Sequence, residues 1–201
     1  MNSLSTIFEF IIIQAAFAFT PGLIITLIVN ESIQKSRKKG LEVAAGAAVG
    51  ALVMTLLSSL IVTFLFAIIP TFLQIIFVVG SIYIIYKGFS TLAMKNIGKE
   101  DKSNQGAFVS GLRVNLINPK MWLFYLSVLP IFVENYERLF TSLIFLGIIT
   151  VFINLFGDIF YALFSSYFFS DSSEKTKNII NKACGVSLIS IGFYLLFTRF
   201  F

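Results

Sequence analysis

Two proline breaks interrupt hydrophobic stretches of this sequence, one in each half, and their residue types suit the binding of an anion. They read Thr20-Pro21-Gly22 and Asn118-Pro119-Lys120. In each, a polar residue that can cap a helix precedes a proline suited to the first helical position, so we expect a helix to restart there. A helix start presents unpaired N–H groups and the positive end of the helix dipole, which attract a carboxylate. Lys120 would strengthen that field, and Asn115 and Asn118 would share one face if the turn between them is helical.

Asp158 is the second candidate for chemistry, because it is the only carboxylate deep inside a hydrophobic segment. An ionisable group at such a depth costs at least a few kcal/mol to insert and is by default a candidate functional residue. Asn154 and Tyr161 lie four residues before it and three after, so the three form a polar stripe on one helical face. Together with the proline breaks, Asp158 predicts a site for a zwitterion, with its carboxylate at the helix starts and its ammonium at Asp158.

These features also have structural interpretations, which the sequence leaves open. Both prolines could be ordinary kinks satisfied by neighbouring helices, and Lys120 could reach toward the cytoplasmic headgroups. Asp158 could be paired with a lysine or with a neighbouring helix.

The composition is that of a membrane protein. Hydrophobic residues make up 57% of the 201 residues, charged residues 12%, and the mean hydropathy is +0.91. A soluble domain is about half apolar and roughly a quarter charged. Histidine is absent and Cys184 is the only cysteine, so we expect no disulfide, no metal site and no cofactor.

We expect an all-α, polytopic membrane protein with six spans, since runs of about 20 apolar residues cross a bilayer. It would be a single transporter domain over residues 1–201, with repeat halves at about 1–90 and 105–201 and a cytoplasmic loop at about 90–106. The expected spans are 7–29, 43–69, 72–89, 112–133, 139–169 and 179–198.

The distribution of basic residues predicts the orientation. Thirteen of the fifteen Lys and Arg residues lie in, or at the span ends beside, the loops after the first, third and fifth spans. The positive-inside rule then places both termini outside. Three spans in each half require the second copy to enter from the opposite side, which predicts two inverted three-helix repeats. Pro119 would then lie near the cytoplasmic face, unless the segment from Ala107 to Asn118 is re-entrant.

Glycines predict where helices pack closely. Gly46 and Gly50 form a GxxxG pattern in an apolar segment, which favours close helix approach, with a homodimer interface as the alternative. Gly80 and Gly88 in the third expected span correspond loosely to Gly185 and Gly192 in the sixth, which supports the repeat. We expect Gly80 and Gly88 to pack helices as well.

These motifs resemble the LysE/RhtB family of amino-acid exporters over nearly the whole chain. The most specific element is Asn115-Leu-Ile-Asn118-Pro119-Lys120 with the upstream Gly111, and Asp158-x-x-Tyr161 extends the match. The resemblance implies a small exporter of amino acids or their derivatives in the bacterial inner membrane. The sequence departs from the family at Leu23, where a second proline is usual, and at Ala51, where an acidic residue is common.

We therefore expect a secondary active exporter working by alternating access, with proton-coupled antiport as the expected mechanism. Its partners would be a small amino-acid substrate and the lipid bilayer, and no nucleic acid is expected. An intramembrane aspartyl protease would need a second facing aspartate, and no HExxH or GxSxG pattern occurs, so an enzyme is not expected. A channel or a non-transporting membrane scaffold is the alternative.

Overall fold

The computed structural model describes residues 3–20, 22–69, 72–93 and 106–169, together with residues 182, 185, 186, 189, 190, 192–194, 196 and 197. Every regular element within these ranges is a helix. Pro21, most of the loop expected at residues 90–106, and half of the expected span at 179–198 lie outside the described residues. The α-helical expectation therefore holds for the part of the chain that the structure describes.

The first expected span is a pair of helices bent by 51°, α1 (Leu4–Phe19) and α2 (Leu23–Gln34). The expectation that Thr20 caps the second helix is wrong. Thr20 instead ends α1, and its hydroxyl donates to the carbonyl of Ala16 at 2.8 Å. A threonine in the last turn of a helix can bond the carbonyl four residues back, and that bond occupies its hydroxyl. Gly22 is the residue that caps α2, without a side chain to do so.

Two long helices form the centre of the molecule, and both were expected as spans. They are α3 (Arg37–Ile68) and α7 (Leu139–Phe169). At 1.5 Å per residue, α3 is about 48 Å long, well beyond the roughly 30 Å of the hydrocarbon core. Within the described ranges, two helices are long and apolar enough to cross a membrane, or three if the bent pair α1–α2 counts as one span.

The fourth expected span, at residues 112–133, is not one continuous helix. The chain forms α5 (Ala107–Leu116), breaks at residues 117–118, and restarts as α6 (Pro119–Leu123). Asn118 caps α6 as expected, because its side chain accepts the Lys120 backbone N–H at 3.0 Å and Pro119 is at the first helical turn. The chain continues through a π-helix, η1 (Phe124–Val128), and two 3₁₀ turns, η2 (Leu129–Phe132) and η3 (Tyr136–Arg138).

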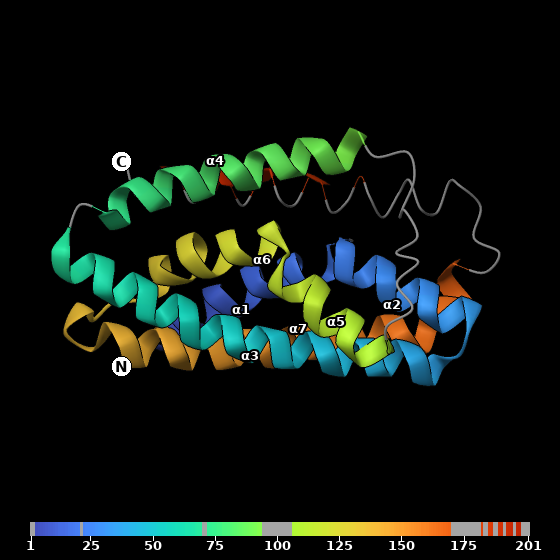
Figure 1. Ribbon diagram of the computed structural model, residues 1–201. Coiled ribbons are helices and arrows are strands. Elements are labelled where there is room, and N and C mark those ends of the chain that lie inside the picture. The colour runs from blue at the N-terminus through green and yellow to red at the C-terminus, as the bar shows by residue number, and fades with distance from the viewer. Residues whose placement is uncertain are drawn as a thin grey trace.

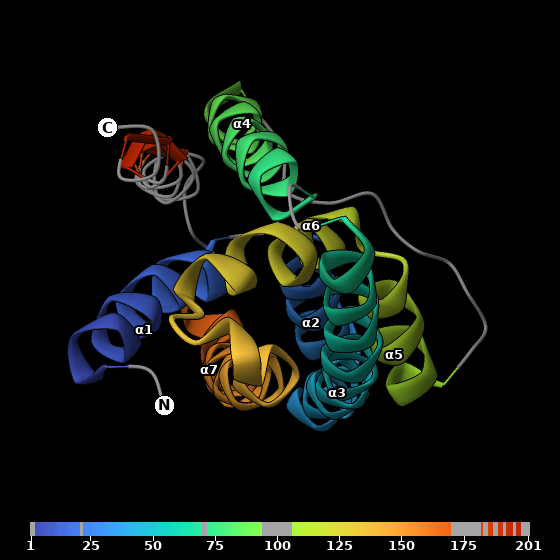
Figure 2. The same ribbon diagram turned by 90° about the vertical axis from the view of Figure 1, so that its left-hand side faces the viewer.

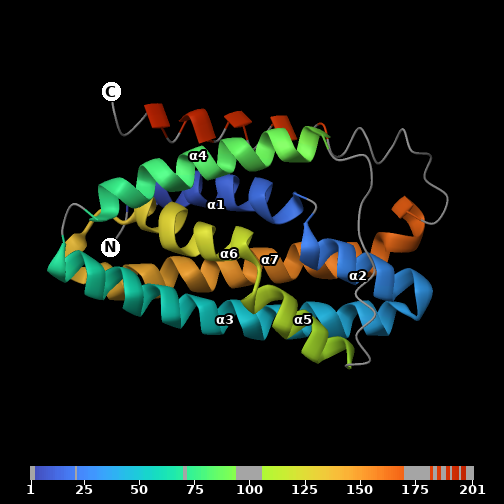
Figure 3. The same ribbon diagram turned by 45° about the horizontal axis from the view of Figure 1, so that its top comes forward.

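The two broken helices run in opposite directions and meet at their breaks. Figures 1 and 3 show α1–α2 and α5–α6 crossing the molecule antiparallel, with both interruptions near mid-length. The long helices α3 and α7 pack side by side and also run antiparallel. A third long helix, α4 (Phe72–Ala93), packs against η1 and lies on the far side of α6 from α7 (Figure 2).

Glycines allow α3 and α5 to touch backbone to backbone. A Cβ at Gly46 would collide with the carbonyl of Phe108, and a Cβ at Gly111 would collide with the carbonyl of Val43. One turn further along α3, a Cβ at Gly50 would lie 3.1 Å from the Cβ of Asn115. The GxxxG pattern thus packs α3 against α5 of the same chain, and it fixes the position of Asn115.

The remaining glycines of the expected packing set lie in α4. A Cβ at Gly88 would lie 2.5 Å from Ile189 Cγ1, so α4 approaches the C-terminal part of the chain closely there. Gly80 also lies in α4, but its surroundings are outside what the structure describes.

Candidate functional site

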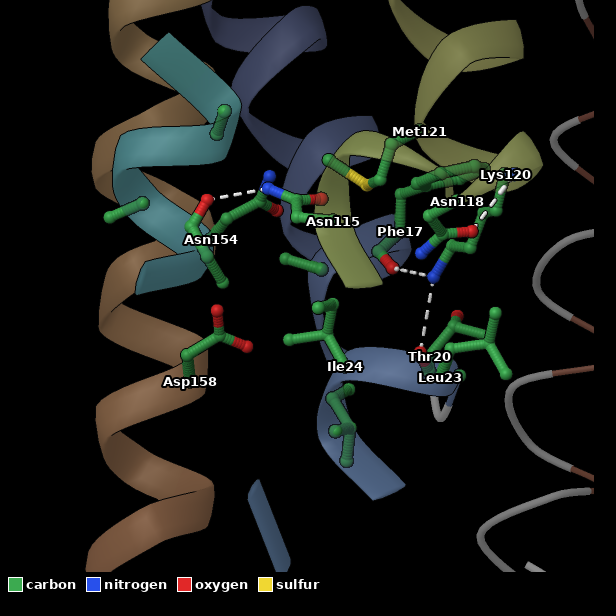
Figure 4. Close-up of a pocket in the computed structure, with 16 residues that line it drawn as sticks. Phe17, Thr20, Leu23, Ile24, Asn115, Asn118, Lys120, Met121, Asn154 and Asp158 are labelled. Carbon is green, nitrogen blue, oxygen red and sulfur yellow. Dashed lines mark hydrogen bonds between the residues drawn. The ribbon is translucent and has the colours of Figure 1, made fainter. Parts of the chain in front are cut away.

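A partly open cavity of about 40 Å³ lies where the two helix breaks face α7. Its walls come from five elements far apart in sequence: the end of α1, the start of α2, the middle of α3, the α5–α6 break and the middle of α7. Figure 4 shows Asp158 and Asn154 projecting from α7 on one side, with Lys120, Asn118 and Thr20 on the other. Six residues of the predicted site line the cavity, namely Thr20, Gly22, Asn115, Asn118, Lys120 and Asp158.

The wall formed by α7 carries the acidic group of the cavity. Asp158 is buried, and no basic nitrogen of the described residues lies within 4 Å of its carboxylate. The positive charge of Lys120 acts on it through space. One turn away, Asn154 Oδ1 accepts a hydrogen bond at 2.8 Å from Nε2 of Gln14, while Asn154 Nδ2 has no partner among the described residues.

Gln14 is a polar residue of this region that the sequence reasoning missed. It is 1% exposed in the middle of α1, and its Oε1 has no partner within the described part of the chain. The available signal was a lone amide in the otherwise apolar run at residues 10–19, because a buried polar group in a membrane helix needs a specific partner. Its bond to Asn154 ties α1 to α7 beside the cavity.

The opposite wall is built by the α5–α6 break. Asn115 is buried at the end of α5, and its Nδ2 donates to the carbonyl of Ala47 on α3 at 2.5 Å. Its Oδ1 is buried without a partner among the described residues, and it can accept a hydrogen bond from a ligand. Asn118 uses its own oxygen to cap α6, so its amide N–H groups are the donors it can offer.

Lys120 reaches from α6 to the end of α1. Its Nζ donates to the carbonyls of Phe17 at 3.0 Å and Thr20 at 3.1 Å, which are the last carbonyls of α1, and it lies 4.5 Å from the centre of the Phe17 ring. A cation at the C-terminal end of a helix is favoured by the helix dipole. The side chain thus crosses from the second break to the first and places a positive charge at the cavity.

Pro119 and Tyr161, also predicted for the site, do not line the cavity. Pro119 begins α6, the helix that carries Lys120. Tyr161 is on α7 next to the cavity, and its hydroxyl donates to the carbonyl of Phe19 at 2.8 Å. That bond engages the last residue of α1, so Tyr161 helps to fix the first break. The remaining predicted residue, Pro21, lies outside the described residues.

The size of the cavity limits what fits in this conformation. A volume of about 40 Å³ holds roughly three water molecules. A carboxylate or an ammonium group fits this space, but a whole amino acid requires the walls to move apart. The described residues contain no group of three or more His, Cys, Asp or Glu side chains that could hold a metal ion.

The fold and the cavity define an integral membrane protein built around two broken helices. A sequence model of the LysE type translocator family matches residues 15–199, so the chain belongs to this family of membrane transport proteins. It is also 28% identical over 201 residues to an uncharacterized membrane protein of Synechocystis sp., covering 97% of this chain and 96% of that protein. No solved structure matches the chain.

Proposed function

We propose that this protein is a secondary active exporter of amino acids or amino-acid derivatives across the bacterial plasma membrane. The observation that carries the proposal is the cavity with the Asp158 carboxyl group on one wall and a lysine with amide donors on the other. Amino acids carry opposite charges at two neighbouring positions, and this arrangement has the complementary charges. Membership of a translocator family supports transport as the activity.

In the proposed binding mode, the substrate carboxylate lies at the start of α6, near Lys120 and the amide of Asn118. A helix start favours an anion, and Lys120 adds a full positive charge. The substrate ammonium lies against Asp158 and the unpaired Oδ1 of Asn115. Thr20 and Gly22 shape the first break, whereas Pro119 and Tyr161 act by positioning α6 and the end of α1.

Six spans in two inverted three-helix repeats, with both termini outside, remain our proposal for the whole chain. The antiparallel courses of α1–α2 and α5–α6, and of α3 and α7, support it. Irregular backbone inside a bilayer is tolerated where it is buried in protein or lines a cavity, and in transporters such breaks mark the substrate site. Alternating access would then be a rocking of the two halves about this cavity.

Energetics constrain the coupling, and we propose a proton as the coupling ion. Moving a net +1 substrate out against an inside-negative potential costs about 2.3 kcal/mol per 100 mV, whereas a zwitterion pays no electrical cost. A proton that enters as the substrate leaves would drive export of either. Asp158 is the carboxylate of the cavity that we propose to carry it.

The test is an exchange assay with the purified protein in lipid vesicles, preloaded with one unlabelled amino acid at a time. We expect uptake of the labelled amino acid to be saturable, stereospecific and stimulated by the same amino acid on the other side. Flux that is linear in concentration and lacks stimulation would show a channel, and no flux with any amino acid would show a scaffold. Either result refutes the proposal.

A further inference from the structure

A row of hydroxyl groups leads from the cavity along α3. Thr55, Ser59 and Thr63 are spaced four residues apart, so they follow one face of the helix. The row begins one turn beyond Ala51, which lines the cavity. At 1.5 Å per residue, Ala51 to Thr63 spans about 18 Å of helix toward the end at Ile68. We call Thr55, Ser59 and Thr63, together with Tyr125 of η1, the hydroxyl row.

Ser59 and Thr63 differ from other hydroxyl residues of these helices. Thr20, Thr55 and Thr150 each donate to the carbonyl four residues earlier in their own helix. Serine and threonine commonly make this bond inside helices. The Oγ of Ser59 and the Oγ1 of Thr63 are buried and have no hydrogen-bond partner among the described residues. These two groups can therefore exchange hydrogen bonds with a ligand that passes between the helices.

Thr55, the residue of the row nearest the cavity, is tightly packed. A Cβ at Gly147 of α7 would collide with the Thr55 side chain, so α7 presses on it from one side. The hydroxyl of Tyr125 lies against Thr55 from η1. Tyr125 is 1% exposed and belongs to a π-helix, a helix form that often occurs at functional sites.

We propose that the hydroxyl row is the path by which the substrate leaves the central cavity, with Tyr125 and Thr55 as the gate. This inference rests on the proposed function and adds the route. A hydroxyl group both donates and accepts hydrogen bonds, so one row can contact the carboxylate and the ammonium of an amino acid in turn. Because the groups are neutral, they would pass a zwitterion on without holding it as the charged cavity does.

The route is tested by the labelling of single cysteines with a membrane-impermeant thiosulfonate, which needs water to react. Cys184→Ser removes the only native thiol. In that background, Ser59→Cys and Thr63→Cys are compared with Leu56→Cys and Leu60→Cys, whose native side chains are each 50% exposed on the lipid side of the same helix. Reagent is added on the side of the membrane where α3 ends.

We expect Ser59→Cys and Thr63→Cys to react at least about tenfold faster than the two lipid-facing controls, because thiolate reactivity follows access to water. The gate is tested with Ala48→Cys, which reports on the cavity. When Tyr125→Ala is combined with Ala48→Cys, reagent added on the side where α3 ends should label the cavity cysteine about tenfold faster than in Ala48→Cys alone.

Equal labelling of the row and the lipid-facing controls, in vesicles that still exchange amino acids, would overturn the route. Labelling of Ala48→Cys that Tyr125→Ala leaves unchanged would overturn the gate. If the protein with Cys184→Ser alone exchanges no amino acid while the native protein does, Cys184→Ala replaces it as the background. If the native protein also fails to exchange, the proposed function is refuted, and the inferred route falls with it.

Discussion

Replacement of Lys120 by Met removes the charge that joins the two helix breaks while it keeps the apolar length of the side chain. Lys120 makes two hydrogen bonds to carbonyls at the end of α1, at 3.0 and 3.1 Å. A hydrogen bond from a charged group contributes about 1.5–3 kcal/mol, so the lower end of that range gives about 3 kcal/mol for the pair. Each 1.4 kcal/mol is tenfold in an equilibrium constant, and Lys120→Met should therefore favour local opening of the α1–α2 break by roughly 150-fold.

The assay is hydrogen exchange of backbone amides in lipid nanodiscs, followed by mass spectrometry of peptides that cover the first break. The reporting amides are those of Thr20, which bonds the carbonyl of Phe17, and Thr26, which bonds that of Gly22. Lys120→Arg keeps the charge and should stay close to the native rates. Lys39→Met removes a lysine that forms a surface pair with Glu42 at 2.6 Å. Such a pair contributes about 0–1 kcal/mol, so this control should leave the break unchanged.

Amino-acid exchange should also fall in Lys120→Met, because the positive charge of the cavity is lost. Native exchange rates at Thr20 and Thr26 in this variant would refute the idea that Lys120 holds the breaks together. Native transport would refute its proposed place in the anion site.

Three further predictions follow from other contacts. Gly46→Ala should greatly reduce the yield of folded protein, because the added Cβ meets the Phe108 carbonyl. Gly106→Ala is the control, since a Cβ there meets no atom within 4 Å. Equal yields of the two variants would contradict the α3–α5 packing. Pro119→Ala should insert normally but transport less, since α5 can then continue across residues 117–118; native transport would reduce this proline to a kink. Glu134 accepts hydrogen bonds from Ser3 and Thr6 at the start of α1, and the Ser3 hydroxyl is the main cause of its lowered pKa. The contribution of a carboxylate with a lowered pKa is complete above its ordinary pKa and is lost as pH falls through the lowered value. Distance probes attached to residues next to Ser3 and Glu134, which leave both side chains in place, should therefore report separation only in acid. Glu134→Gln should abolish that pH dependence. If the variant still separates only in acid, as the native protein does, the role of Glu134 is refuted.

The sequence predicted the elements whose signals are local. The bounds of α7 and the restart at Asn118-Pro119 depend on an apolar run and on a cap followed by proline, and both agree with the structure. A lone carboxylate in a span also singled out Asp158, which lines the cavity.

What the sequence could not predict depends on tertiary contacts. Thr20 can cap the helix after it or bond the helix before it, and local sequence does not choose between them. The sequence left open where the Lys120 side chain points, because a long flexible side chain can reach any acceptor that the fold places near it. In the structure these acceptors are the carbonyls of Phe17 and Thr20. The bond between Gln14 and Asn154 joins residues 140 positions apart, which no spacing rule anticipates.

The most direct test of the account is net transport by Asp158→Asn in lipid vesicles under an imposed pH gradient. The substitution keeps the size of the side chain and removes its charge. The account predicts that the native protein accumulates an amino acid against its gradient and that Asp158→Asn does not, at equal abundance in the membrane. Accumulation by Asp158→Asn at the native level, with the same dependence on the pH gradient, would contradict the proposed role of the cavity in transport.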